Sequence, residues 1–268
     1  MANPEIQIAK PEIRVAAGKG RPVREWVPSC FLVMHDAHVS TSIRYSPMHI
    51  QRAADVTYRS TIKLYGRSPV QPIWTAESGV MQLDDVFAVE SGRIASDLGV
   101  EKLFVYGEAF NRSPEMAPPT PNIAMNLHVR YGSDDGSLHG QLASFFIFGA
   151  PRSIQRGVSY YESFPGARAN ADHSLSAFII NPFLRTSGYR IHIVDAKRGT
   201  WTSPGFTVKG KGAAEWNSAK SDFPGSPDPI GIIVQSDLKT TSFFATRNAE
   251  GKMIGLDHGH PFLAQVLQ

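Results

Sequence analysis

The stretch 188–194 reads Gly188-Tyr189-Arg190-Ile191-His192-Ile193-Val194, and apolar and polar side chains alternate along most of it. Alternation with a period of two places one face of an extended chain in a core and the other in water, as in a half-buried β-strand. The same pattern recurs in residues 61–65, 126–131 and 206–209. Helical patterns are rare, and residues 92–99 are the best candidate for a helical turn. The sequence therefore predicts an all-β fold.

Continuous apolar runs at residues 31–34, 103–106 and 230–234 indicate more deeply buried strands. Turn-forming residues lie between the strand-like segments, for example at 133–136 and 248–251. Many short strands separated by turns are typical of β-sandwiches and β-barrels.

The composition excludes several classes of protein. The chain has 268 residues, of which 42% are hydrophobic and 19% charged, as in ordinary globular proteins. The formal net charge is only +3, and the absence of long Lys/Arg runs argues against nucleic-acid binding. Neither a secretory signal nor an apolar stretch long enough to span a membrane is visible, and Cys30 is the single cysteine. These features favour a cytoplasmic protein, with secretion after removal of a signal as the alternative.

Six blocks of the first half resemble six blocks of the second half, in the same order. The pairs are 20–21 with 166–168, 31–36 with 178–183, 62–64 with 191–193, 73–75 with 200–202, 103–105 with 232–234, and 129–136 with 245–251. The offset between the halves changes only in loop-like sequence, where insertions are tolerated. We therefore predict two tandem antiparallel β-sandwich domains related by internal duplication. They span residues 12–148 and 158–266, with a linker at 149–157 and an extended arm at 1–11.

The densest polar cluster is Asp257-His258-Gly259-His260. Residues i and i+2 of a strand point to the same face, so His258 and His260 are candidates to hold one divalent metal ion, with Asp257 beside them. The alternative is a surface turn. The sequence otherwise predicts no cofactor.

A second cluster, His35-Asp36-Ala37-His38, follows a buried run. Asp36 is a candidate to orient a histidine as a general base, and Cys30 is a candidate nucleophile beside His35. However, Cys30 stands at the start of an apolar run, and buried cysteines are usually inert.

Trp74 and Trp201 occupy matching places in the two halves. Both are candidates to bind a carbohydrate or another small ligand, although a shared packing role is the better explanation of the match.

These observations favour a non-enzymatic binding or assembly protein made of tandem β-sandwiches. The first alternative is an enzyme with a histidine-based site between the repeats, and the second is a small-ligand binder that uses its tryptophans. We also expect a protein partner or self-association. In residues 1–11, Pro4 and Pro11 disfavour a helix, and an extended arm can pair with an exposed sheet edge.

Overall fold

The computed structural model describes residues 23–26, 29–45, 59–81, 85–112, 127–133, 139–143, 151–154, 158–238, 241–258 and 260–267. Strands dominate this part of the chain, and all strand pairs in it are antiparallel. The prediction of an all-β fold is therefore confirmed. The predicted helical turn is α1 (Ser91–Leu98), which ends at Gly99 in a left-handed conformation with φ 64°.

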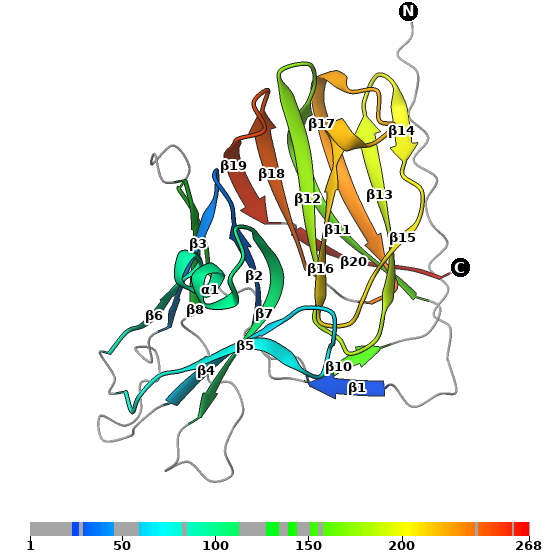
Figure 1. The fold of residues 1–268 in the computed structure, drawn as a ribbon. Helices are drawn as coiled ribbons and strands as arrows, with labels where there is room; N and C mark the ends of the chain where they lie inside the picture. Colours follow the sequence, from blue (N-terminus) through cyan, green and yellow to red (C-terminus); the bar gives the residue numbers. More distant parts are fainter. Residues whose placement is uncertain are drawn as a thin grey trace, which may run out of the picture.

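Two four-stranded sheets form the first sandwich (Figure 1). One has the order β2-β7-β4-β5, with bounds Ser29–His35, Leu103–Arg112, Arg59–Tyr65 and Pro72–Glu77. The other has the order β6-β3-β8-β9, with bounds Phe87–Glu90, Ser40–Tyr45, Leu127–Gly132 and His139–Ala143.

The second sandwich contains a larger sheet in the order β14-β13-β17-β11-β20. Its bounds are Gly199–Thr202, Ser187–Asp195, Ser226–Ser236, Val158–Ala169 and His260–Leu267, and β15 (Phe206–Val208) also pairs with β13. The facing sheet has the order β16-β12-β18-β19, with bounds Gly212–Asn217, His173–Asn181, Thr241–Asn248 and Met253–His258. A 3-10 turn, η1 (Ser218–Lys220), follows β16, and β1 (Val23–Trp26) pairs with β10 (Pro151–Ile154).

The two sandwiches use their strands in the same order. The sheet β5-β4-β7-β2 corresponds to β14-β13-β17-β11, and the sheet β6-β3-β8-β9 corresponds to β16-β12-β18-β19. One block of the sequence alignment does not follow this correspondence. Residues 31–36, mostly in β2, were matched to 178–183, mostly in β12, although β12 takes the place of β3. Both segments are continuous apolar runs, which carry no periodic signal that fixes a register.

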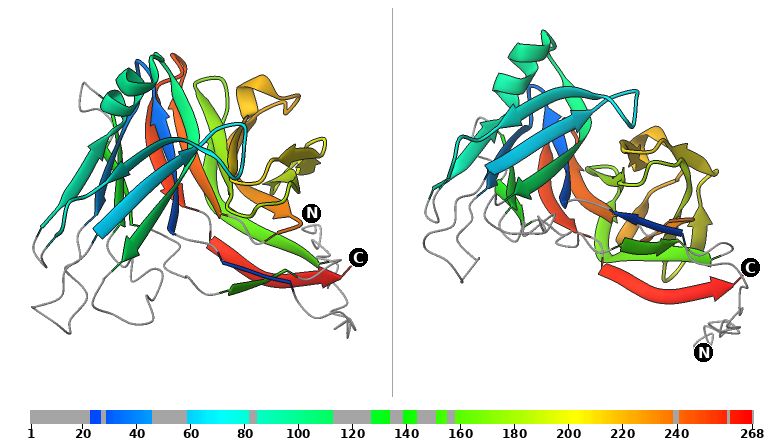
Figure 2. Two further views of the ribbon diagram at one scale, coloured as in Figure 1. Left: turned by 60° about the horizontal axis from the view of Figure 1, so that its bottom comes forward. Right: turned by 90° about the horizontal axis from the view of Figure 1, so that it is seen from below.

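A continuous core joins the sandwiches, which lie side by side in Figure 2. Phe178 and Phe243 of the second sandwich are buried in the same cluster as the core of the first. Their rings contact those of Phe104 and Tyr131 at centroid distances of 5.9 and 6.5 Å. No helix in the described residues has the length and apolarity needed to cross a membrane.

Candidate functional site

The predicted metal ligands at the end of the sequence do not share one strand. His258 ends β19 and His260 begins β20, and these strands belong to the two different sheets of the second sandwich. The single-strand argument for a shared face therefore does not apply to these histidines. Their side chains lie outside the described residues, and metal binding by them stays a prediction. Asp257 is exposed and stands opposite Phe244 in the pairing of β18 with β19. Across the described residues, no three His, Cys, Asp or Glu side chains are grouped as metal ligands.

The second predicted cluster separates into different environments. Cys30 is buried in β2. The Nδ1 atom of His35 lies 3.3 Å from the Oγ atom of Ser91, at the start of α1. Asp36 accepts hydrogen bonds at Oδ1 from the backbone N–H groups of His38 and Val39, at 2.7 and 3.0 Å. Asp36 therefore caps its own turn, and no catalytic pair with Cys30 is formed by these described contacts.

Both tryptophans proposed as ligand platforms are half-buried and pack against the cores. The Trp74 indole Nε1 donates a hydrogen bond to Asp97 in α1 at 3.1 Å. The Trp201 ring contacts Trp216 and Phe223 at centroid distances of 5.9 and 5.5 Å. Their rings thus have packing partners, and ligand binding by either ring stays a prediction.

A cleft of about 430 Å³ lies between the two sandwiches. We call it the inter-sandwich cleft. Asp36 and His38 line it from the β2–β3 turn, and residues 170–174 line it from the β11–β12 turn. Further lining residues come from β16, η1 and the β18–β19 turn, where residues 247–251 take part. The charged residues that line the cleft are Asp36, Asp172, Glu215, Lys220, Arg247 and Glu250.

Arg247 organises one wall of the inter-sandwich cleft. Its guanidinium forms an ion pair with Glu215 at 3.1 Å and donates to the Ser176 hydroxyl and the Gly251 carbonyl, each at 3.0 Å. These contacts fix the wall and use three of the five guanidinium donors of Arg247.

Four other charged or titratable side chains at the cleft have no partner in the part of the chain that the structure describes. The side chains of His38, Asp172, Lys220 and Glu250 make no hydrogen bond or ion pair within the described residues, and all four are exposed. Charges of both signs thus remain available to a ligand.

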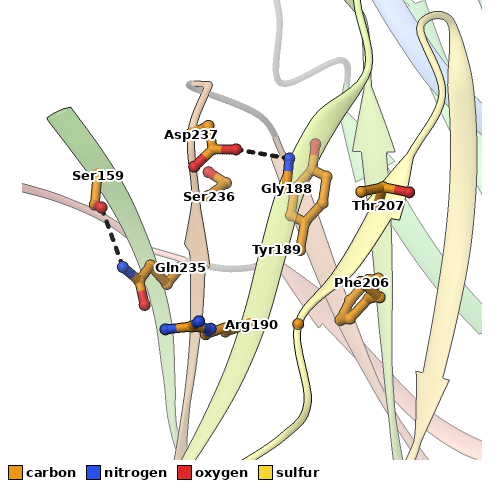
Figure 3. A pocket seen from close by; sticks show the side chains of 10 residues that line it. Ser159, Gly188, Tyr189, Arg190, Phe206, Thr207, Gln235, Ser236 and Asp237 are labelled. Carbon is orange, nitrogen blue, oxygen red and sulfur yellow. Dashed lines mark hydrogen bonds between the residues drawn. The ribbon is translucent and has the colours of Figure 1, made fainter. Parts of the chain in front are cut away.

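A second hollow, of about 350 Å³, lies on the sheet of β13 and β17 (Figure 3). We call it the outer-face groove. Arg190 and Tyr189 come from β13, Gln235 from β17, and Phe206 from β15. Ser159 of β11 lies on one side of the groove in Figure 3 and Phe206 on the other.

A chain of hydrogen bonds crosses four strands beside this groove. The two ring nitrogens of His192 lie 2.9 Å from Thr202 Oγ1 and from Gln235 Oε1. The amide Nε2 of Gln235 then donates to the Ser159 hydroxyl at 3.0 Å. Because an amide cannot relay a proton as an imidazole does, this chain orients side chains and does not form a catalytic triad.

A buried charge pair links the sandwiches. Lys211, in the turn before β16, places its Nζ atom 3.0 Å from Glu108 Oε2 and 4.4 Å from the centre of the Tyr65 ring. Glu108 is fully buried, and Tyr106 donates its hydroxyl to Oε1 at 2.8 Å. Burial and the neighbouring carboxylate raise the pKa of Tyr65 and Tyr106 well above the usual tyrosine value, so both phenols stay protonated. We infer a structural role for this cluster, because its buried polar groups pair and hydrogen-bond with one another.

Sequence reasoning did not find the outer-face groove or the buried pair. His192 and Arg190 lie on the polar face of the alternating stretch that predicted the strand. The stretch alone does not show which residues of the neighbouring strands lie beside them. Lys211 lies between Gly210 and Gly212, and the sequence indicated only a turn there.

The sequence matches no family model and no curated protein, and no solved structure matches the fold.

Proposed function

We propose that the chain is a non-catalytic binding protein whose two sandwiches arose by duplication and together hold a charged segment of a protein partner. The shared strand order supports the duplication, and so do hydrogen bonds that recur at corresponding places. The first recurrence is in the turns. Asn170 Oδ1 accepts from the N–H groups of Asp172 and His173, as Asp36 Oδ1 accepts from the two residues at the same spacing.

The second recurrence joins the strand after that turn to a serine. The N–H of Thr41 in β3 donates to Ser91 Oγ at 2.8 Å, and the N–H of Leu175 in β12 donates to Ser218 Oγ at 2.9 Å. Each serine begins the helical turn that follows the edge strand of its sheet. Such paired details are not required by a sandwich as such, and they favour common descent of residues 12–148 and 158–266.

A third recurrence bears on the register of the tryptophans. Ser78 donates to the next carbonyl at 2.8 Å, and Ser203 does the same at 2.9 Å, each just after its edge strand. With these serines matched, Trp201 corresponds to Ala76, and Trp74 lies two residues earlier on the same face. In this register the tryptophans are neighbours. The pairing of 62–64 with 191–193 instead makes them equivalent, because Leu64 lies opposite Trp74 and Ile193 lies opposite Trp201.

The observation that carries the binding proposal is the set of unpaired charges at the inter-sandwich cleft. Asp172 and Glu250 favour cationic groups, and Lys220 favours anionic groups. The side-chain-capped turn around Asp36 holds one rim, so little ordering is needed on binding. A polar protein segment that carries both signs of charge fits this lining better than an apolar ligand does.

The test selects random heptapeptides on the wild-type protein and measures the enriched peptides by fluorescence anisotropy. The double variant Asp172→Asn/Lys220→Gln removes two charges from the cleft. Two exposed pairs at about 0.2–1 kcal/mol each predict a loss of affinity of about 2- to 30-fold. The control Glu101→Gln/Lys102→Gln removes two exposed charges from the α1–β7 connection and should leave affinity unchanged. Equal affinity for both double variants would refute the cleft as the binding site.

Two observations are reasons to test the enzyme alternative in the same experiment. His38 and His173 both line the cleft, and His173 Nδ1 lies 3.2 Å from Asn170 Oδ1. Cleavage of bound peptides that disappears in His38→Ala would replace the binding proposal by a histidine-based enzyme. The arm proposed for self-association, residues 1–11, lies outside the described residues, and light scattering after its deletion tests that proposal.

A further inference from the structure

The outer-face groove carries two opposite charges that the fold keeps apart. Arg190 stands opposite Gln235 in the pairing of β13 with β17, and Asp237 follows Gln235 by two residues. Diagonal neighbours of this kind have Cα atoms about 7–8 Å apart. No ion pair joins Arg190 to Asp237 in the described part of the chain, and Figure 3 places them at opposite ends of the lining residues.

Asp237 is held in place by the backbone of β13. Its Oδ2 atom accepts the N–H of Gly188 at 2.8 Å, and its own N–H donates to the Gly188 carbonyl at 3.2 Å. The other carboxylate oxygen, Oδ1, has no hydrogen bond within the described residues. A Cβ atom at Gly188 would lie 2.6 Å from Oδ2, so the glycine makes the position of this carboxylate possible.

Arg190 supplies the opposite charge. Its side chain is exposed and forms no hydrogen bond or ion pair within the described residues. Five guanidinium donors therefore remain for an anionic group.

Neutral groups of the groove complete the donor set. Ser159 is 8% exposed, and its oxygen accepts from Gln235, so its own hydroxyl proton remains to be donated. The half-buried Phe206 ring, stacked on Tyr189 at a centroid distance of 5.8 Å, gives the groove one apolar wall. An anion placed near Arg190 is thus met by charged and neutral donors, and a cation near Asp237 is met by a carboxylate.

We propose that the outer-face groove binds a small zwitterion of the α-amino acid class. The carboxylate of the ligand contacts Arg190, the ammonium contacts Asp237 Oδ1, and an apolar side chain lies against Phe206. A volume of about 350 Å³ is at the lower end of the range for small-molecule sites, which suits a ligand of this size. This site is separate from the inter-sandwich cleft and does not depend on the function proposed for the cleft.

The ligand series tests the two charges separately. L-Alanine, propionate and L-alaninamide are titrated into the isotopically labelled full chain, and the amide signals of Gly188 and Gly205 are followed by NMR. Propionate lacks the ammonium and alaninamide lacks the carboxylate. We expect each to bind at least about tenfold more weakly than alanine, because each loses a charge-assisted hydrogen bond. Equal binding of propionate and alanine would reduce the groove to an anion site and overturn the proposal.

Three variants test the residues. Arg190→Gln and Asp237→Asn each remove one charge, and Gly188→Ala displaces the Asp237 carboxylate without any change of charge. We expect all three to weaken alanine binding about tenfold or more. Lys220→Gln removes a positive charge in the cleft and serves as the matched control, with unchanged alanine binding. Because that variant weakens only the cleft, the failure of one proposal is distinguishable from the failure of the other. Absence of alanine binding to the wild type, or unchanged binding in Arg190→Gln, refutes the site.

Discussion

Replacement of Lys211 by methionine tests the buried link between the sandwiches. Methionine keeps an unbranched apolar chain that can lie against Tyr65, but it removes the ammonium from Glu108. Without the ammonium, the fully buried Glu108 carboxylate would be left with neutral tyrosine hydroxyl groups, those of Tyr106 and Tyr65, as its hydrogen-bond partners in the described residues. The variant therefore isolates the cost of an uncompensated buried charge.

The expected cost is large for a single substitution. Removal of one partner from a buried ion pair typically lowers the free energy of unfolding by about 3–5 kcal/mol. The Lys211 side chain is only 17% exposed, so solvent screens the pair weakly. For a chain of this size, such a loss corresponds to a decrease in Tm of roughly 6–20 °C. The φ angle of Lys211 is 47°, a left-handed conformation that is unfavourable for a side-chain-bearing residue. The ion pair with Glu108 holds Lys211 in this unfavourable backbone conformation.

The assay is urea denaturation of Lys211→Met, Glu108→Gln and the double variant. Because the pair can be replaced by neutral groups at little cost, we expect the double variant to recover most of the loss caused by Lys211→Met. Lys209→Met, an exposed lysine in the same loop, is the control and should change stability by less than about 0.5 kcal/mol. A cost below about 1 kcal/mol for Lys211→Met, or strict additivity in the double variant, would refute the account of a buried pair.

Three further outcomes are expected. Gly107→Ala should destabilise the first sandwich by about 1–3 kcal/mol in urea denaturation, because the new methyl group collides with the Phe31 ring; unchanged stability would show that the core repacks freely. Trp201→Ala should cost less than the about 3–5 kcal/mol of a fully buried tryptophan, because the ring is half-buried, and thermal melting measures the difference. Hydrogen bonds from the Ser226 hydroxyl and neighbouring backbone N–H groups lower the pKa of Asp195, so its ionised form stabilises the fold above about pH 4 and that contribution is lost as the pH falls through the lowered pKa. The stability difference between wild type and Asp195→Asn should therefore shrink below about pH 4, and a difference that is constant with pH would contradict the assignment.

The strands were predictable because their signal is local. In β13, alternate residues from Ser187 to Asp195 are buried, as the alternation of the sequence indicates. The register between the halves was less predictable for the same physical reason. A shift of two residues returns every side chain to the same face. Alternation alone therefore does not decide whether Trp201 corresponds to Trp74, as their cross-strand partners Leu64 and Ile193 suggest, or to Ala76, as the serines suggest.

The candidate sites were less predictable because strand pairing assembles them. Arg190 and Asp237 are separated by 47 positions in the sequence (237 minus 190), and only the pairing of β13 with β17 brings them to one face. His258 and His260 show the converse. They are close in the sequence, but the chain leaves one sheet and enters the other between them. The single-strand geometry assumed for these two histidines is therefore absent, and metal binding by them stays a prediction.

Because the two sandwiches share a core, we expect them to move as one rigid body. Phe178 and Phe243 are buried against the first sandwich, so a bend between the halves has to expose aromatic surface. The shared core, and not the covalent connection, then sets the angle between the halves, and insertions in the connection outside the paired strand β10 should leave that angle unchanged. Natural variation is expected to be constrained at the aromatic contacts and less constrained in the connection outside β10.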